Sequence, residues 1–281
     1  MTQQKLGLLF MAPVAAFLLI GFVSPILIVG WYSLMEPRSF DLNTVFTIAN
    51  YRSAFSDGYG PPFFWSLNFA AVTTLTCLVL AWPTAKLLHR FAGRGAAVIT
   101  ALIAVPIFIS ESVRLFGMSL FLMPGGGILA GSMRALFDLS IGSVLNTKLA
   151  VYLGLVYVHF PFVLFPALLG VALIPQDRID AARDLGASRW QVLREVELPL
   201  ALPGLVIGAL LTFVLCIGAN AEAAILGGQT VTVLTRAVEQ RFSYAQDWPM
   251  GAALTMLVIA MTAVFVFPAL SRLDLNRLIR R

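Results

Sequence analysis

The most regular feature of the chain is a series of long apolar runs that alternate with shorter polar connections. A helix needs about 20 predominantly apolar residues to cross the hydrocarbon core of a membrane. Runs of this kind lie at about 6–34, 65–88, 97–122, 149–174, 200–222 and 251–270. Prolines within the runs are tolerated where neighbouring helices pack in a bundle. The pattern predicts an all-α integral membrane protein with six transmembrane helices, which form a single transmembrane domain over residues 1–281.

The composition supports a membrane protein. Hydrophobic residues make up 59% of the 281 residues and charged residues 12%, about half the charged share of a typical soluble domain. The formal net charge is +5, but the basic residues are spread between apolar runs without interleaved aromatics. Nucleic-acid binding is therefore not indicated. Cys77 and Cys216 both lie in apolar runs, which indicates neither a disulfide nor a metal site.

The distribution of lysine and arginine predicts the orientation of the chain. Cytoplasmic loops of membrane proteins carry an excess of these residues. The N-terminus, the 89–96 loop, the 175–199 loop and the tail after Leu270, counted together with Lys86, hold twelve of them, whereas the opposite side holds seven. The first apolar run is too long for a signal peptide and is interpreted as a retained span. Both termini and the 175–199 loop are predicted to be cytoplasmic.

The 175–199 loop is the longest charged interval in the chain. Gly186 is placed to end a first short helix, and Ser188 with Gln191 three residues later forms the pattern of a capping box that begins a second one. Charged and apolar side chains alternate along both helices. A helical hairpin that docks on another protein is one interpretation, and an ordinary cytoplasmic loop that contains a helix is the other.

The spacing in this loop resembles the EAA loop of type I ABC importer permeases: an acidic residue, two alanines, three residues, Gly, nine residues, an aliphatic residue, any residue, then Leu-Pro. The matching residues are Ala181, Ala182, Gly186, Val196, Leu198 and Pro199, with Asp180 in the place of the usual Glu. In that family the loop is a coupling helix that sits in a groove of a cytoplasmic ATPase subunit. The resemblance implies that the coupling contact is made by Asp180, Ala181, Ala182, Asp184, Gly186, Ala187, Arg189 and Trp190.

Other short segments resemble the spermidine/putrescine-type branch of the same family. They are the third span with Arg114, the start of the fifth span from Leu198-Pro199 to Pro203-Gly204, the Leu226-Gly227-Gly228 segment, and Trp248-Pro249 with Gly251-Ala252-Ala253. The resemblance implies import of a small organic solute, with a polyamine as the best candidate, across a bacterial inner membrane. An opine, an amino-acid derivative, a phosphonate or ferric iron are alternative solutes.

The resemblance also implies partners. They are a second permease subunit that forms a heterodimer with this chain, two cytoplasmic ATPase subunits that bind ATP and magnesium, and a soluble solute-binding protein. This chain itself is then expected to hold no cofactor and to catalyse no reaction.

Ionisable residues at membrane depth are candidates for the solute pathway, because burying a charge in lipid is expensive. Glu111 and Arg114 lie one helical turn apart in the third span, and a structural ion pair between them is favoured. Glu222, with Asn220 nearby, ends the fifth span, where it contacts either the solute or water. These four residues are the pathway candidates.

Catalytic and metal-binding patterns are not apparent in the sequence. His89 and His159 have no Cys, Asp or Glu at ligand spacing, and His159 is expected to make a hydrogen bond to another helix. A transporter driven by an ion gradient is the competing class. Such a transporter would ordinarily need intramembrane carboxylates or broken helices, and the sequence offers Glu111 and Glu222.

Overall fold

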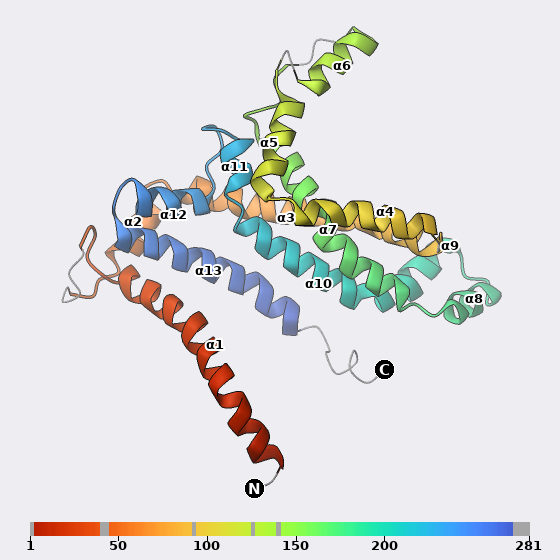
Figure 1. Cartoon of the computed structure of the whole chain (residues 1–281), viewed down its shortest axis with the longest axis horizontal. Helices are drawn as coiled ribbons and strands as arrows, with labels where there is room; N and C mark the ends of the chain where they lie inside the picture. The colour runs from red at the N-terminus through yellow and green to blue at the C-terminus, as the bar shows by residue number, and fades with distance from the viewer. Residues whose placement is uncertain (1–2, 40–44, 92–93, 125–126, 139–141, 272–281) are drawn as a thin grey trace. The chain divides into compact units, whose positions relative to one another are not determined.

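The computed structural model describes residues 3–39, 45–91, 94–124, 127–138 and 142–271. Every regular element in these ranges is helical, which confirms the all-α prediction. The predicted cytoplasmic tail beyond Ser271 lies outside the described residues. The elements, labelled in Figure 1, are α1 (Gln3–Ser33), α2 (Ala49–Ser56), α3 (Gly60–Arg90), α4 (Arg94–Ala104), η1 (Val105–Phe108), α5 (Glu111–Leu122), α6 (Ile128–Phe137), α7 (Lys148–Ala172), α8 (Gln176–Asp184), α9 (Arg189–Gln191), η2 (Val192–Glu197), α10 (Leu198–Ile217), α11 (Ala221–Ile225), α12 (Leu234–Ser243) and α13 (Trp248–Ser271).

Long apolar helices account for the predicted spans. Within the described residues, five helical stretches are long and apolar enough to cross a membrane: Met11–Ser33, Gly60–Arg90, Lys148–Ala172, Arg189–Ile217 and Trp248–Ser271. The third predicted span is a broken one, in which Gly95–Phe108 and Glu111–Leu122 meet at 104°. A continuous helix over 97–122 was therefore a wrong prediction. The fifth span ends at Ile217, which places Glu222 in the separate short helix α11 rather than at the end of the span.

The break in the third span has a local cause. Pro106 has no backbone N–H and cannot continue an α-helical hydrogen-bond ladder, and the chain tightens there into the 3₁₀ helix η1. Ile109 and Ser110 then adopt extended backbone conformations, with ψ angles of 136° and 135°. Glu111 lies in the first turn of α5, where a carboxylate is stabilised by the unpaired N–H groups of the helix start.

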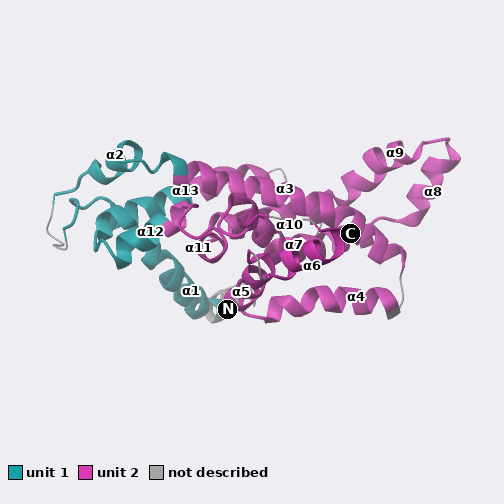
Figure 2. Ribbon diagram, turned by 90° about the horizontal axis from the view of Figure 1, so that it is seen from above, with its two compact units in different colours: residues 1–61, 237–260 teal, residues 62–236, 261–281 magenta. Residues whose placement is uncertain are grey.

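The chain divides into two compact units, coloured separately in Figure 2. The first comprises residues 1–61 and 237–260. Within it, the buried Asn50 of α2 donates from Nδ2 to the backbone oxygens of Met35, at 2.7 Å, and Ser33, at 3.2 Å. These bonds satisfy carbonyl groups at the end of α1, which a helix leaves unpaired. Asn50 therefore fixes α2 to the end of the first span.

The second unit comprises residues 62–236 and 261–281, and its core lies between α3, α7 and α10. Small side chains dominate the contact. The buried core residues are Cys77, Ala81, Ala85 and Leu88 of α3, Val163, Leu164, Ala167 and Val171 of α7, and Ala201 and Leu205 of α10. Small residues at a helix interface let membrane helices approach closely and gain van der Waals contact, which is a main source of association energy between helices in lipid.

The closest approach is between α7 and α10. A Cβ atom added to Gly204 would lie 2.3 Å from the backbone oxygen of Pro166 and 2.9 Å from the Cα of Gly170. A Cβ on Gly170 would in turn lie 2.8 Å from the oxygen of Ala201. Only glycine fits at these two positions without moving the backbones apart. The pair α7 and α10 is thus held at backbone contact distance, and both candidate sites described below are attached to its ends.

Candidate functional site

The 175–199 loop folds into the predicted helical hairpin. Gly186, with φ of +84°, follows α8 in the left-handed conformation that favours glycine. Its N–H donates to the oxygen of Arg183 at 2.8 Å, and the N–H of Ala187 donates to the oxygen of Ala182 at 3.0 Å. These two bonds are the Schellman arrangement that closes a helix C-terminus. Gly186 therefore ends the first helix, as predicted from the sequence.

The second helix of the hairpin begins at the predicted capping box. Ser188 accepts on Oγ from the N–H of Gln191 at 3.3 Å, and Gln191 Oε1 accepts from the N–H of Ser188 at 2.8 Å. After α9 the chain passes directly into η2, a π-helix over Val192–Glu197, and then into α10. π-helical turns are rare and are frequently found at functional sites. The hairpin is thus joined to a membrane span without an intervening loop.

The hairpin presents apolar side chains that the chain itself leaves uncovered. Leu185 is 90% exposed and Trp190 is 67% exposed. Around them lie the charged residues Asp180 and Arg183, whose side chains form an exposed pair at 3.6 Å. None of the eight predicted coupling residues is buried. An aromatic residue exposed beside charged ones is typical of the centre of a protein interface.

An ion pair ties the hairpin exit to a membrane helix. Lys86 Nζ, near the end of α3, lies 2.5 Å from Glu197 Oε2 in η2. The Glu197 side chain is 7% exposed and that of Lys86 is 41% exposed. The ammonium group offsets the cost of removing the carboxylate from water. Sequence analysis did not predict this pair. The feature that could have indicated it is the acidic Glu197, which stands directly before the apolar run that begins at Leu198.

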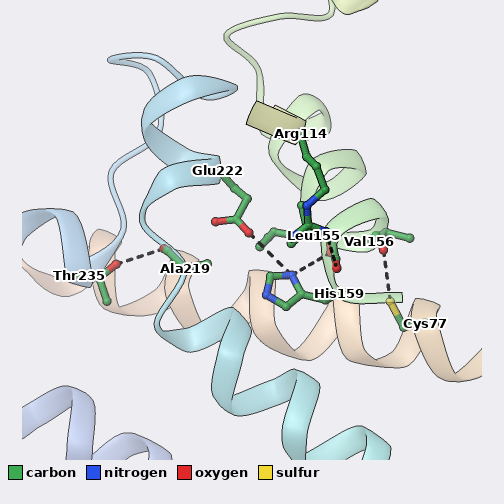
Figure 3. A network of polar contacts seen from close by, with 9 residues as sticks. Cys77, Arg114, Leu155, Val156, His159, Ala219, Glu222 and Thr235 are labelled. Carbon is green, nitrogen blue, oxygen red and sulfur yellow. Dashed lines mark hydrogen bonds and ion pairs between the residues drawn. The ribbon is translucent and has the colours of Figure 1, made fainter. Parts of the chain in front are cut away.

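A second group of polar side chains meets where α5, α7 and α11 come together in the second unit (Figure 3). Glu222 of α11 is 1% exposed, and neither of its carboxylate oxygens has a hydrogen-bond partner in the part of the chain that the structure describes. His159 of α7 faces it, with Nδ1 3.7 Å from Glu222 Oε1. Arg114 of α5 is the third member. We call Glu222, His159 and Arg114 the polar cluster.

The hydrogen-bond partner of His159 differs from the predicted one. Its Nδ1 lies 3.0 Å from the backbone oxygen of Leu155, one turn earlier in the same helix. The carbonyl can only accept, so Nδ1 carries the proton and donates. The predicted hydrogen bond to another helix was wrong. In a neutral ring the other nitrogen, Nε2, is then a hydrogen-bond acceptor. His159 was not among the predicted pathway residues, because a lone histidine in an apolar run gives no sign of what it faces.

The predicted ion pair between Glu111 and Arg114 is not formed in the described structure. Arg114 Nη1 instead donates to the backbone oxygen of Val158 at 3.5 Å, and its buried Nε has no hydrogen-bond partner among the described residues. Glu111 is exposed at the start of α5. Both residues lie in α5, one turn apart, but Arg114 bonds to α7 rather than to Glu111. Asn220, the last pathway candidate, is half-buried and directly precedes α11.

In the described ranges, no group of three His, Cys, Asp or Glu side chains lies close enough together to hold a metal ion. The polar cluster instead combines one buried carboxylate, one imidazole and one guanidinium between helices. Such a cluster can hold a small polar or charged solute by hydrogen bonds.

Long apolar helices, a broken span and a buried polar cluster between helices are typical of a multi-pass membrane transport protein. The family described as binding-protein-dependent transport system inner membrane component matches residues 77–277. The chain belongs to this family and is a permease subunit of an ABC importer.

Curated relatives agree with this assignment, and a solved structure shares the fold. The chain is 30% identical to the spermidine/putrescine transport system permease protein PotB of Haemophilus influenzae, over 79% of this chain and 77% of the relative. It is 28% identical to PotB of Escherichia coli, over 90% and 92% of the two chains. The bacterial alginate ABC transporter, solved in complex with an alginate-bound periplasmic protein, has a chain of similar fold, with a TM-score of 0.78, 15% identity and coverage of 95% of this chain and 93% of that one.

The Lys86–Glu197 pair generates a prediction about stability. Lys86→Gln leaves a buried carboxylate without its counter-charge and should lower the free energy of unfolding by roughly 1–3 kcal/mol. Glu197→Gln leaves an ammonium that can reach water, so its cost should be smaller. The double variant, which removes both charges, should be more stable than Lys86→Gln alone. Thermal denaturation of the three purified variants in one detergent measures these stability changes. An equal loss of stability in all three variants would contradict the buried ion pair.

Proposed function

We propose that this chain forms part of an ATP-driven importer that carries a polyamine, such as spermidine or putrescine, into the bacterial cytoplasm. The observation that carries the proposal is the buried carboxylate of Glu222, which has no hydrogen-bond donor in the described chain. The two PotB relatives are spermidine/putrescine permeases. A solute with protonated amines provides the donors that this carboxylate lacks.

The polar cluster suits a cation that must bind and leave. A carboxylate out of water is costly unless a cation or donor approaches it. An ammonium group has three N–H donors, which can bond to Glu222 and to the acceptor nitrogen of His159. Arg114 is held by the oxygen of Val158 and contributes a fixed positive charge that limits how tightly a second cation binds. The solute is therefore stabilised without being trapped.

The hairpin is proposed to connect this site to ATP hydrolysis. Its exposed Leu185 and Trp190 are suited to a groove on a cytoplasmic ATPase subunit, and two such subunits would bind the ATP and magnesium. This chain then transmits motion and hydrolyses nothing. Closure of the ATPase pair would move the hairpin and shift the spans between inward-open and outward-open states, each exposing the polar cluster to one side.

The remaining partners follow from the same arrangement. If the hairpin meets a cytoplasmic ATPase, both termini lie on that side too, because four of the six predicted spans precede the hairpin and two follow it. The bias of basic residues supports this. Exposed apolar residues of α1, such as Phe17 and Phe22, offer a surface for lipid and for a second permease subunit. The alginate transporter was solved with a periplasmic protein, which supports a soluble binding protein that delivers the solute.

Removal of the Glu222 charge tests the solute assignment. Glu222→Gln keeps the shape but loses a charge-assisted hydrogen bond of about 1.5–3 kcal/mol, so spermidine uptake should fall roughly 10- to 100-fold in kcat/KM. Glu222→Asp should be milder. Uptake of radiolabelled spermidine into proteoliposomes is the measurement, and Asp57→Asn, which changes an exposed acid in the first unit, is the matched control. Unchanged uptake in Glu222→Gln would exclude Glu222 from the pathway.

Removal of the exposed aromatic on the hairpin tests the coupling assignment. Trp190→Ala takes away a side chain with the properties of an interface hot spot, worth about 2 kcal/mol or more. We expect the ATPase subunit to bind at least tenfold more weakly, while the amount of permease in the membrane stays the same because Trp190 is exposed. Tyr244→Ala, which removes another exposed aromatic side chain in the first unit, is the control. Normal copurification of the ATPase with Trp190→Ala would place the contact elsewhere.

A further inference from the structure

A large cavity lies where α3 and α7 end and the hairpin begins. It has a volume of about 1190 Å³, and its wall includes Trp82, Lys86 and Arg90 from the last turns of α3 together with Arg183 and Arg189 from the hairpin. Because α3 and α7 are both long enough to cross a membrane, their ends place this cavity at the membrane–water interface. We call it the interfacial cavity.

The interfacial cavity holds positive charge that the protein does not neutralise. Lys86 is balanced by Glu197, the acidic residue of the wall. Arg183 forms an exposed ion pair with Asp180. Water screens such a pair, so it offsets little of the positive charge of Arg183. The side chains of Arg90 and Arg189 make no ion pair or hydrogen bond in the described part of the chain. Two guanidinium groups from different elements therefore border one cavity without an anion.

The rest of the wall is apolar or amphipathic. Leu87, Val171 and Ile174 also line the cavity, so the charged part adjoins a surface that suits hydrocarbon. Trp82 carries an amphipathic ring, a residue type enriched at the level of lipid head groups. A ligand that matches this wall has an anionic end and an apolar end.

We propose that the interfacial cavity binds the phosphate-bearing head group of an anionic phospholipid, with Arg90 and Arg189 as its phosphate ligands. A guanidinium group presents its N–H donors in a planar fork that matches phosphate oxygens. Basic pockets between membrane helices are suited to anionic head groups. The first carbons of the acyl chains then contact Leu87 and Ile174. Lipid binding at this site does not depend on which solute the transporter carries.

The hairpin then contacts both the lipid and the ATPase subunit, through different residues. Arg189 lines the interfacial cavity, whereas its neighbour Trp190 and the exposed Leu185 do not. Arg189, which the sequence resemblance placed among the ATPase contacts, is assigned instead to the lipid. A lipid bound here contacts both α3 and the hairpin, and so influences the element that is proposed to couple ATP hydrolysis to transport.

Lipid binding to the purified full-length chain tests the proposal. The chain in neutral detergent is titrated with phosphatidylglycerol or with phosphatidylcholine of the same acyl chains, and bound lipid is counted by native mass spectrometry. Wild type should retain phosphatidylglycerol in preference to phosphatidylcholine. Arg90→Gln/Arg189→Gln should bind phosphatidylglycerol at least tenfold more weakly, and Arg90→Lys/Arg189→Lys should recover part of the loss. The control Arg178→Gln/Arg194→Gln, which removes two exposed arginines outside the cavity wall, should bind as wild type does.

Four results would overturn the proposal. The first is equal retention of both lipids by wild type, and the second is an equal loss in the control double variant. The third is displacement of phosphatidylglycerol by millimolar inorganic phosphate, which would assign the arginines to a free anion. Unchanged lipid binding by Arg90→Gln/Arg189→Gln, together with loss of the ATPase subunit from the complex, would likewise assign them to the protein interface. Both arginines are exposed, so a thermal melt that matches wild type is the expected check on folding.

Discussion

The backbone contact between α7 and α10 is the constraint on which the rest of the second unit depends. In lipid, apolar side chains gain nothing by leaving one apolar environment for another, so helices associate through close packing instead. Gly170 and Gly204 provide that packing, because no larger residue fits between the two backbones. The two helices are therefore a stiff pair, and the segments at their ends are positioned by it.

The two ends of this pair carry the two functional regions. At one end α7 leads into the hairpin, which returns through the π-helix η2 to α10. Away from the hairpin, α7 carries His159 near its middle, and α10 is followed by α11 with Glu222. Packed helices therefore connect the hairpin to the polar cluster, as the proposed coupling requires. The Lys86–Glu197 pair adds α3 to the same body, since it anchors η2 where the hairpin joins the membrane.

Sequence reasoning predicted what depends on local pattern. Apolar run length gave the helical membrane fold, and Gly186 and Ser188 gave the hairpin, because caps are determined by neighbouring residues. It missed what depends on distant residues. The helix break beside Pro106 was hidden within an unbroken apolar run. Glu111 and Arg114 keep their predicted one-turn spacing within α5, but Arg114 bonds to the backbone oxygen of Val158 in α7 instead. His159 and Glu222, or Lys86 and Glu197, are brought together by packing, and one sequence without its relatives carries no sign of such pairs.

ATP-dependent uptake tests the central claim most directly, that this chain is the permease of an importer driven by a separate ATPase. The chain is assembled with its partner permease and ATPase subunits in proteoliposomes, with the binding protein outside, and entry of spermidine is followed. The account predicts uptake that requires ATP on the ATPase side, stops when the ATPase is omitted, and is unaffected when proton and sodium gradients are collapsed. Uptake by this chain without ATPase, driven by an ion gradient, would contradict it.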